Sequence, residues 1–308
     1  MKTDLPRVEH VYQNHILDST RWSRFRPRQG DIVIVTPYKS GTTWMQAIVL
    51  NLIFQDLVLR PIEEYSPWID LRSPSPDALF DRLEQQEHRR CVKSHLPLDG
   101  LPYFSQVQYI VVNRDPRDVF MSLWNHYSHL TSESFQANDD TPGRVGEPFP
   151  RCPPDLRAFW RNWSTRGWFP WESEGYPFWA NLRHAQSWWN YRHLTNILFV
   201  HYHDLLENLP REVRRVATYL GIPVTPDLVE KVADRVHFRA MKRDASTILP
   251  HFENLFVGGS QSFIHKGTNG RWHEALTCED LELYRSAAAR ELTPDCAEWL
   301  ERGSSGLT

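Results

Sequence analysis

The sequence predicts a single α/β domain, built around a central parallel sheet with helices on both sides. Runs of β-branched and other apolar residues within 31–35, 108–113 and 197–202 are typical of strands that are buried on both faces. Helical patterns separate these runs, and strands that alternate with helices favour parallel βαβ units with right-handed crossovers. Because α/β folds of 308 residues are often single domains, one domain is expected over 1–308.

The first part of the chain is expected to supply three strands. Residues 1–30 are polar and mixed, and they should lead in across the surface before a first strand, loop and helix over about 31–56. Ser75-Pro76 should begin a second helix, because proline fits the first helical position. The elements expected next are a short strand over 91–95, a buried strand over 108–113 and a helix over about 117–130.

The second part of the chain mixes helices with irregular segments. Residues 131–176 are rich in Pro, Gly, Trp and Asp and show no clear period, so we expect an irregular segment that is functional or mobile. Thr277 and Asp280 form a capping-box pattern that should begin a helix ending near residue 292. The other expected elements are a helix over 177–193, a strand over 197–202, helices over 210–221 and 225–235, an irregular stretch over 244–276 and a frayed tail over 301–308.

The loop after the first strand has the composition of an anion site. A strand that feeds a small-residue turn and then a helix leaves backbone N–H groups pointing at one spot, and the helix dipole adds to their attraction. Lys39 adds a full positive charge, and Gly41 lies in the turn. Hydroxyls come from Ser40, Thr42 and Thr43. The order differs from a Walker loop, in which Lys follows the last glycine, and an ordinary turn with an exposed lysine is the alternative reading.

Three polar side chains follow three different predicted strands. Lys39, His95 and Arg114 each lie just past a strand end, and parallel sheets bind ligands beyond those ends. Lys93 precedes His95 by two residues, so both should project from one face of their strand. A neutral imidazole beside positive charge suits a general base, because that charge opposes its protonation. A hydrogen-bonded, structural histidine is the alternative.

Arg114 and Ser122 are eight residues apart, across a strand end and the first turns of a helix. Both side chains can reach a second phosphate, Arg114 through its bidentate fork and Ser122 through its hydroxyl. Pairing of Arg114 with Asp115 or Asp118 is an equally good reading of the same residues. The segment therefore predicts either a second anion contact or a local ion pair.

The composition argues against several classes of protein. A net charge of −3 and a pI near 6.5 do not fit a nucleic-acid binder that depends on bulk charge. Four scattered cysteines without a C-x-x-C pair suit a reducing compartment, and no signal core or membrane-spanning stretch is present, so a soluble, cytoplasmic protein is expected. His201 and His203 share a strand face without evident acidic partners, so no metal site is expected.

At these residues the chain closely resembles the cytosolic sulfotransferases, as a member of the bacterial type. These enzymes use 3′-phosphoadenosine 5′-phosphosulfate (PAPS) as the donor. Residues 36–44 are similar to the family's 5′-phosphosulfate loop, 93–97 to the segment with the catalytic histidine, and 109–122 to the strand and helix that bind the 3′-phosphate. The residues that match binding positions of the family there are Lys39, Ser40, Gly41, Thr42, Thr43, Trp44, Arg114 and Ser122.

Two later segments extend the resemblance. Tyr202 matches a tyrosine near the adenine, and Phe238 matches an aromatic residue that stacks on it. Residues 265–272 resemble the family's C-terminal phosphate loop, which assigns nucleotide-binding positions to His265, Lys266 and Gly267. The resemblance therefore covers about 31–277, most of the chain.

The resemblance implies a fold and a reaction. The fold is a single α/β domain whose strand–loop–helix, similar to a P-loop, binds the phosphosulfate. The reaction is in-line transfer of the sulfuryl group from the co-substrate PAPS to a hydroxyl or amine of a small-molecule acceptor, without a metal. His95 would remove the acceptor proton, and Lys39 and Lys93 would stabilise the charge that develops during transfer.

Several residues depart from the family pattern. His265 stands where the family usually has Arg, and Arg271 replaces an acidic residue, so either is a candidate for the 3′-phosphate contact. A histidine at that place would change charge near pH 6.5. The family's dimer motif is absent, which leaves the oligomeric state open, and 131–176 has no counterpart and is a candidate for shaping the acceptor pocket.

Two other functions are compatible with parts of the pattern. A nucleotide kinase would need a lysine in Walker order and a Mg²⁺ ligand, and the order of the loop at Lys39 argues against it. A non-catalytic nucleotide-binding protein would need no base, and the presence of His95 argues against that reading. The sequence does not name the acceptor.

Overall fold

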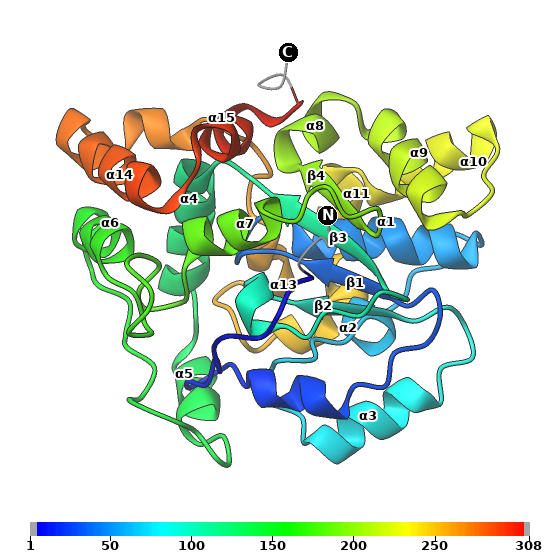
Figure 1. Cartoon of the computed structure of the whole chain (residues 1–308), viewed down its shortest axis with the longest axis horizontal. Coiled ribbons are helices and arrows are strands. Elements are labelled where there is room, and N and C mark those ends of the chain that lie inside the picture. The colour runs from blue at the N-terminus through cyan, green and yellow to red at the C-terminus, as the bar shows by residue number, and fades with distance from the viewer. Residues whose placement is uncertain (1–4, 305–308) are drawn as a thin grey trace.

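A four-stranded parallel sheet lies at the centre of the molecule (Figure 1). The structure is a computed structural model, and it describes residues 5–304. The strands follow the order β2-β1-β3-β4, and every pair of neighbours is parallel. Their bounds are Ile32–Val35 for β1, Cys91–Ser94 for β2, Gln108–Asn113 for β3 and Ile197–His201 for β4. The predicted sheet and its four predicted strands are confirmed, except that Tyr202 begins a helix rather than ending β4.

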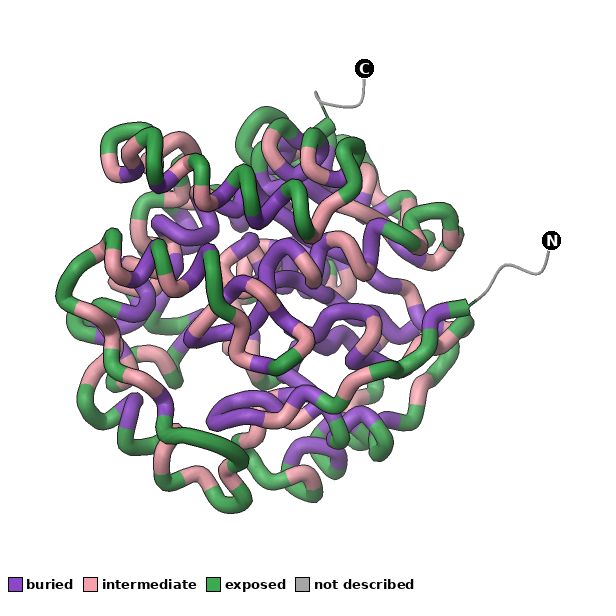
Figure 2. The backbone as a smooth tube through the Cα atoms, turned by 60° about the vertical axis from the view of Figure 1, so that its left-hand side comes forward, coloured by how far each residue is buried: buried purple, intermediate pink, exposed green. Residues whose placement is uncertain are grey.

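The strands are mostly buried, and β4 is the one with two half-buried residues in its middle. Because successive side chains point to opposite sides of a sheet, each strand contributes to both faces. In β1, Val33 and Val35 belong to one apolar cluster, while Ile32 and Ile34 belong to another on the opposite face. Side chains of β3 alternate between the same two clusters. Figure 2 shows that most of the buried residues lie toward the centre of the molecule, and that exposed residues lie mainly around its periphery.

Helices cover both faces of the sheet. One face is packed by α1 (Thr42–Phe54), α9 (Leu209–Leu220) and α10 (Pro226–Val236). The other face is packed by α4 (Pro116–Ser128), α6 (Leu156–Thr165), α7 (Asn181–Trp189) and α14 (Cys278–Glu291). The neighbouring strands β1 and β3 therefore send their helices, α1 and α4, to opposite faces. Such a switch point opens a crevice at the carboxyl ends of the two strands, where ligands bind in open α/β sheets.

The remaining helices are short. They are α2 (Ile62–Tyr65), α3 (Pro76–Glu84), α5 (Ser132–Asp139), α8 (Tyr202–Glu207), α11 (Phe238–Arg243), α12 (Ala245–Ile248), α13 (Gly259–Phe263) and α15 (Pro294–Arg302). Single 3-10 turns lie at Ser19–Arg24, Leu98–Gly100, Pro250–Phe252 and Arg271–Glu274. Over the part of the chain that the structure describes, none of these helices is long and apolar enough to cross a bilayer.

The predicted helix starts are confirmed where capping chemistry was specific. The Thr277 side chain and the Asp280 side chain form the reciprocal capping box at the start of α14. Ser75 caps α3 and Thr225 caps α10, each accepting a hydrogen bond from a backbone N–H of the first turn. Gly221 ends α9 in the left-handed conformation, at a φ of 66°.

The predicted surface lead-in over 1–30 is wrong for much of its length. Tyr12, Leu17 and Trp22 are at most 1% exposed and pack into the apolar cluster on the α4 face of the sheet. They are surrounded by polar neighbours in the sequence, which hides them from a reading based on average composition. Residues 1–4 of that prediction lie outside the described residues.

The predicted irregular segment over 131–176 is wrong in part, because it contains α5 and α6. Thr131 caps α5 and Asp155 caps α6. Phe159, Trp160 and Trp163 form the buried stripe of α6, at a spacing that fits one face of a helix. The abundance of Pro and Gly around this stripe concealed its helical period.

Two further boundaries differ from the prediction. The helix expected over 177–193 begins only at Asn181, so Phe178 and Trp179 precede it. The frayed tail expected over 301–308 is wrong at its start, because Glu301 and Arg302 belong to α15, a helix the sequence reading missed. Residues 305–308 lie outside the described residues.

Candidate active site

The loop between β1 and α1 bends sharply toward the end of the sheet. Lys39 and Gly41 both adopt left-handed backbone conformations, with φ of 63° and 110°. A Cβ atom on Gly41 would lie 2.9 Å from the ring of Tyr202, so only glycine fits at this place. Helix α1 begins at Thr42, which points its free N–H groups toward the loop. The Ser40 hydroxyl is fully buried and has no partner among the described residues, so a ligand oxygen at the loop would satisfy it.

Lys39 is half-buried, and no carboxylate pairs with its amino group in the described part of the chain. Its ammonium lies 3.7 Å from the centre of the Phe263 ring. Burial, together with the charges of Arg114 and Lys93, lowers the pKa of Lys39 to about 7. An anion bound at the loop would favour the charged form, and the geometry therefore suits the predicted phosphosulfate contact.

His95 lies just past β2 with its tautomer fixed by the backbone. Its Nδ1 lies 2.8 Å from the carbonyl oxygen of Thr36, and a carbonyl can only accept, so Nδ1 donates the proton. Nε2 then carries the lone pair that a general base needs. Burial, followed by the charge of Lys93, holds the pKa of His95 well below its usual range. The imidazole is therefore neutral and can accept a proton.

Two carboxylates that the sequence reading missed support this pair of residues. The backbone N–H of His95 donates to Oδ2 of Asp70 at 3.2 Å, which fixes the chain at the base. The ammonium of Lys93 lies 3.6 Å from Oε1 of Glu63 and 5.4 Å from the centre of the Trp68 ring. Both carboxylates lie in the segment between α1 and α3, where no sequence pattern connects them with β2.

One cavity of about 670 Å³ joins the predicted site residues. Lys93 and His95 both line it, as their predicted common face requires. Ser40 is the one predicted site residue that does not line the cavity, and it lies buried within the loop at its edge. The predicted residues that line it are Lys39, Gly41, Thr42, Thr43, Trp44, Lys93, His95, Arg114, Ser122, Tyr202, Phe238, His265, Lys266 and Gly267.

Arg114 faces the cavity and not the nearby carboxylates. Its Nε donates to Oδ1 of Asn269 at 3.0 Å, and its Nη2 donates to the carbonyl oxygen of Thr268 at 2.7 Å. Its guanidinium lies 4.2 Å from the centre of the Tyr202 ring. Asp115 instead forms an ion pair with Arg117 at 2.7 Å. The remaining N–H groups of Arg114 are thus held in place for an anion.

The C-terminal loop completes the positively charged end of the cavity. Gly267 has a φ of 66°, and a Cβ atom there would lie 2.2 Å from the ring of Phe238. The N–H of Gly270 donates to Oδ2 of Asp118 at 3.0 Å, which ties the loop to α4. Arg271 also lines the cavity, and burial together with the charge of Arg114 lowers the pKa of Arg271. This end of the cavity therefore holds two guanidinium groups, those of Arg114 and Arg271.

His265 lines the cavity, and its pKa there is lower than the usual value for histidine. Burial, with the charges of Arg271 and Lys266, lowers the pKa of His265 to about 4. The expectation that it titrates near pH 6.5 is wrong for the protein without ligand, because the surrounding cations oppose its protonation. Its imidazole is neutral there across the physiological range.

The opposite end of the cavity is mainly apolar and aromatic. Tyr38, Trp68 and Trp179 pack around His95, and Phe178 stacks on Tyr38. The 131–176 segment lines this end, as its predicted role as a pocket element requires. Its lining residues are Ser134, Ala137, Asn138, Thr141 and Phe149.

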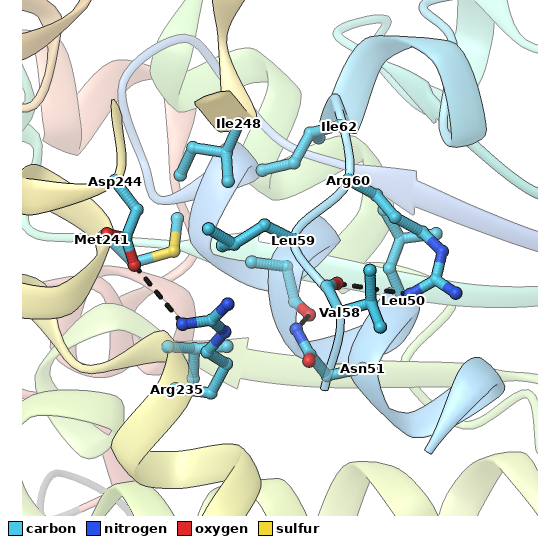
Figure 3. Close-up of a pocket in the computed structure, with 12 residues that line it drawn as sticks. Leu50, Asn51, Val58, Leu59, Arg60, Ile62, Arg235, Met241, Asp244 and Ile248 are labelled. Atoms are coloured by element: carbon cyan, nitrogen blue, oxygen red, sulfur yellow. Dashed lines mark hydrogen bonds and ion pairs between the residues drawn. The ribbon is translucent and has the colours of Figure 1, made fainter. Parts of the chain in front are cut away.

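A second, much smaller cavity of about 30 Å³ lies beside α1 and α10 (Figure 3). Arg235 and Asp244 face each other across it and form an ion pair at 3.3 Å. Its other walls are largely apolar, with Leu50 and Ile248 among them. None of the predicted site residues lines this cavity, so the candidate chemistry is confined to the large one.

The matches to known proteins agree with this geometry. The family model described as "Sulfotransferase domain" matches residues 29–294. The chain belongs to the sulfotransferase family. This sulfotransferase is 30% identical to the "Glycolipid sulfotransferase" of Mycobacterium tuberculosis, over 99% of this chain and 98% of that one. It is 27% identical to "Sulfotransferase 1A1" of Rattus norvegicus, over 86% of this chain and 85% of that one.

Solved structures share the fold of this sulfotransferase. Retinol dehydratase, in complex with androsterone and the inactive cofactor PAP, has a TM-score of 0.66 at 20% identity, over 88% of this chain and 83% of that one. Mouse sulfotransferase SULT7A1, complexed with PAP, has a TM-score of 0.64 at 21% identity, over 88% of each chain. The predicted enzyme class, a PAPS-dependent sulfotransferase, is confirmed, and no finding favours the kinase or non-catalytic alternatives.

Proposed function

We propose that this sulfotransferase uses His95 as the general base that activates a hydroxyl (or amine) of a small-molecule acceptor. The observation that carries the proposal is the arrangement at β2. The carbonyl of Thr36 holds the proton on Nδ1 of His95, and the buried, neutral ring shares a cavity with Lys39 and Lys93. A buried, neutral base beside two lysines suits sulfuryl transfer.

The donor would occupy the charged end of the cavity. The loop from Lys39 to Thr43 would bind the 5′-phosphosulfate, as the residues of a strand–loop–helix bind phosphate. Arg114, Ser122 and Lys266 would bind the 3′-phosphate, with Arg271 as a further cation. Trp44, Tyr202 and Phe238 would contact the adenine. The indole Nε1 of Trp44 is buried and has no hydrogen-bond partner within the described part of the chain, so a ligand atom could satisfy it.

The chemistry would proceed in line. As the acceptor oxygen forms a bond to sulfur, its proton passes to Nε2 of His95, and the bond from sulfur to the bridging oxygen of the donor breaks. 3′-Phosphoadenosine 5′-phosphate (PAP) leaves with that bonding pair. Lys39 and Lys93 would stabilise the charge that develops on the transferring group and the bridging oxygen.

The acceptor is proposed to have an apolar body. Tyr38 and Trp68 pack against the base, Phe178 lines the same cavity, and such an aromatic wall favours apolar ligand surface. One relative is named a glycolipid sulfotransferase, and that name supports a lipid-like acceptor. We also propose that the enzyme acts in the cytoplasm, which the four free cysteines support, and that nucleic acid is not a partner.

A screen for turnover tests the proposed function. Phenols, alcohols, amines, sugars and lipids are incubated with PAPS, and both sulfated product and PAP are measured. We expect sulfation of hydroxyl acceptors with apolar bodies, in a one-to-one ratio with PAP. Release of PAP without any sulfated acceptor, or no reaction across the panel, would contradict the proposal.

A further inference from the structure

His126 is a buried polar side chain in the cavity for which the proposed reaction has no use. It lies on α4, one helical turn after Ser122, and both residues line the same cavity. The residue is 5% exposed, and its Nδ1 has no hydrogen-bond partner among residues 5–304. Buried polar atoms are normally satisfied, so an unpartnered one in a ligand cavity indicates a contact made by the ligand.

The described surroundings of His126 are mainly aromatic. Four aromatic rings pack around the imidazole, at centroid distances of 4.9 to 6.4 Å: Tyr38, Phe178, Phe256 and Phe263. Burial, followed by the charge of Lys39, holds the pKa of His126 well below its usual range. The neutral ring carries one N–H donor and one acceptor nitrogen, so it can bind either a hydroxyl or a carbonyl group.

His126 lies close to the base that activates the acceptor. His95 and His126 both pack edge-on against the ring of Tyr38, at centroid distances of 5.0 Å and 5.2 Å. One small ring system can therefore approach both imidazoles. Lys39, which is assigned to the phosphosulfate of the donor, packs on the ring of Phe263, and that ring also contacts His126. His126 therefore lies near the place where the donor and the acceptor would meet.

We propose that His126 is a specificity-determining residue, which hydrogen-bonds a second polar group of the acceptor. The preferred acceptor then carries two oxygens on one ring or on adjoining rings: a hydroxyl that reacts at His95, and a second group that binds His126. This inference deepens the proposed function and rests on it. An acceptor without the second group leaves the imidazole unpaired, and sites built to bind a hydroxyl discriminate strongly against analogues that lack it.

Matched acceptors and one substitution test the proposal. The acceptors are 2-naphthol and the isomers of dihydroxynaphthalene, and kcat/KM is measured with PAPS for each. We expect the wild-type enzyme to prefer at least one diol isomer over 2-naphthol by about tenfold or more. His126→Phe keeps an aromatic ring at this place but removes both nitrogens, so that preference should fall by about tenfold. His126→Gln keeps a hydrogen-bonding group and should retain part of the preference.

His251 supplies a matched control. It lines the same cavity but is exposed at its edge, where water can satisfy its nitrogens. His251→Phe makes the same chemical change and should keep the wild-type ratio of kcat/KM for the diol over 2-naphthol. Calorimetric binding of PAP to each variant shows that the fold and the donor site are intact.

The outcomes separate this inference from the function on which it rests. If naphthols are sulfated but the wild type prefers no diol isomer, or His126→Phe keeps the preference, the inference is wrong and water satisfies the imidazole. An equal loss of the preference in His126→Phe and His251→Phe also overturns it. If no acceptor of any class is sulfated while PAP binds, the proposed function fails, and the inference fails with it.

Discussion

Arg114→Ala should weaken the binding of nucleotides that carry a 3′-phosphate and leave the binding of those without it almost unchanged. In the structure the guanidinium is held by Asn269 and Thr268 and packs on Tyr202, so it is positioned before a ligand arrives. Hydrogen bonds to charged groups contribute about 1.5–3 kcal/mol, so the loss corresponds to roughly 10- to 150-fold in affinity. We expect PAP to bind weaker by that factor, whereas adenosine 5′-phosphate, which lacks the 3′-phosphate, should change by less than about threefold.

Isothermal calorimetry with both nucleotides at one salt concentration measures these constants directly. Asn269→Ala serves as the control, because it removes one tether of Arg114 and leaves its charge in place. That variant should weaken PAP by much less than Arg114→Ala does. If Arg114→Ala weakens both nucleotides by equal factors, Arg114 only supports the loop at Thr268, and its assignment to the 3′-phosphate is refuted.

Three further predictions follow from the charges and the backbone of the site. His265 has a pKa of about 4 without ligand, and a bound 3′-phosphate would raise that pKa. We therefore expect His265→Arg to bind PAP more tightly than the wild type at pH 8, and the PAP affinity of the wild type, but not of the variant, to rise from pH 8 toward pH 6. Identical pH profiles of the two proteins in calorimetry would assign the contact to Arg271. Glu63→Gln removes the carboxylate that lies 3.6 Å from the ammonium of Lys93, and it should lower kcat about two- to tenfold without changing PAP affinity. An unchanged kcat in steady-state assays would contradict a positioning role for Glu63. Gly41→Ala places a Cβ atom 2.9 Å from the ring of Tyr202, at a backbone φ of 110°. The free energy of unfolding, measured with urea, should fall by about 1–3 kcal/mol, and a variant as stable as the wild type would contradict the strain.

The convergence of the site was predictable from the sequence because it follows from topology. Parallel strands end at one edge of a sheet, so Lys39, His95 and Arg114 had to approach each other once their strands were identified. The two-residue spacing of Lys93 and His95 likewise fixed their common direction. These arguments needed only local patterns and the chirality of βαβ units.

The residues that the sequence reading missed are set by tertiary contacts. Glu63 and Asp70 meet β2 only because the segment after α1 folds back along this edge strand, and nothing in their local pattern marks them. His126 has the helical spacing of any core residue, and what distinguishes it is a place at the cavity together with a nitrogen that has no partner among residues 5–304. Tyr12 packs against Phe169 and Trp171, and the indole of Trp22 donates to Asp70, so both are buried by residues far away in the sequence, which average composition does not reveal.

The central claim, that His95 is the base for transfer to the acceptor, is tested most directly by His95→Ala in a paired measurement. Turnover with PAPS and an acceptor found in the screen is measured beside calorimetric binding of PAP. A general base contributes about 10²–10⁴-fold, so kcat should fall by at least about a hundredfold while PAP affinity stays within about threefold of wild type. Near-native turnover in this variant would contradict the assignment of His95.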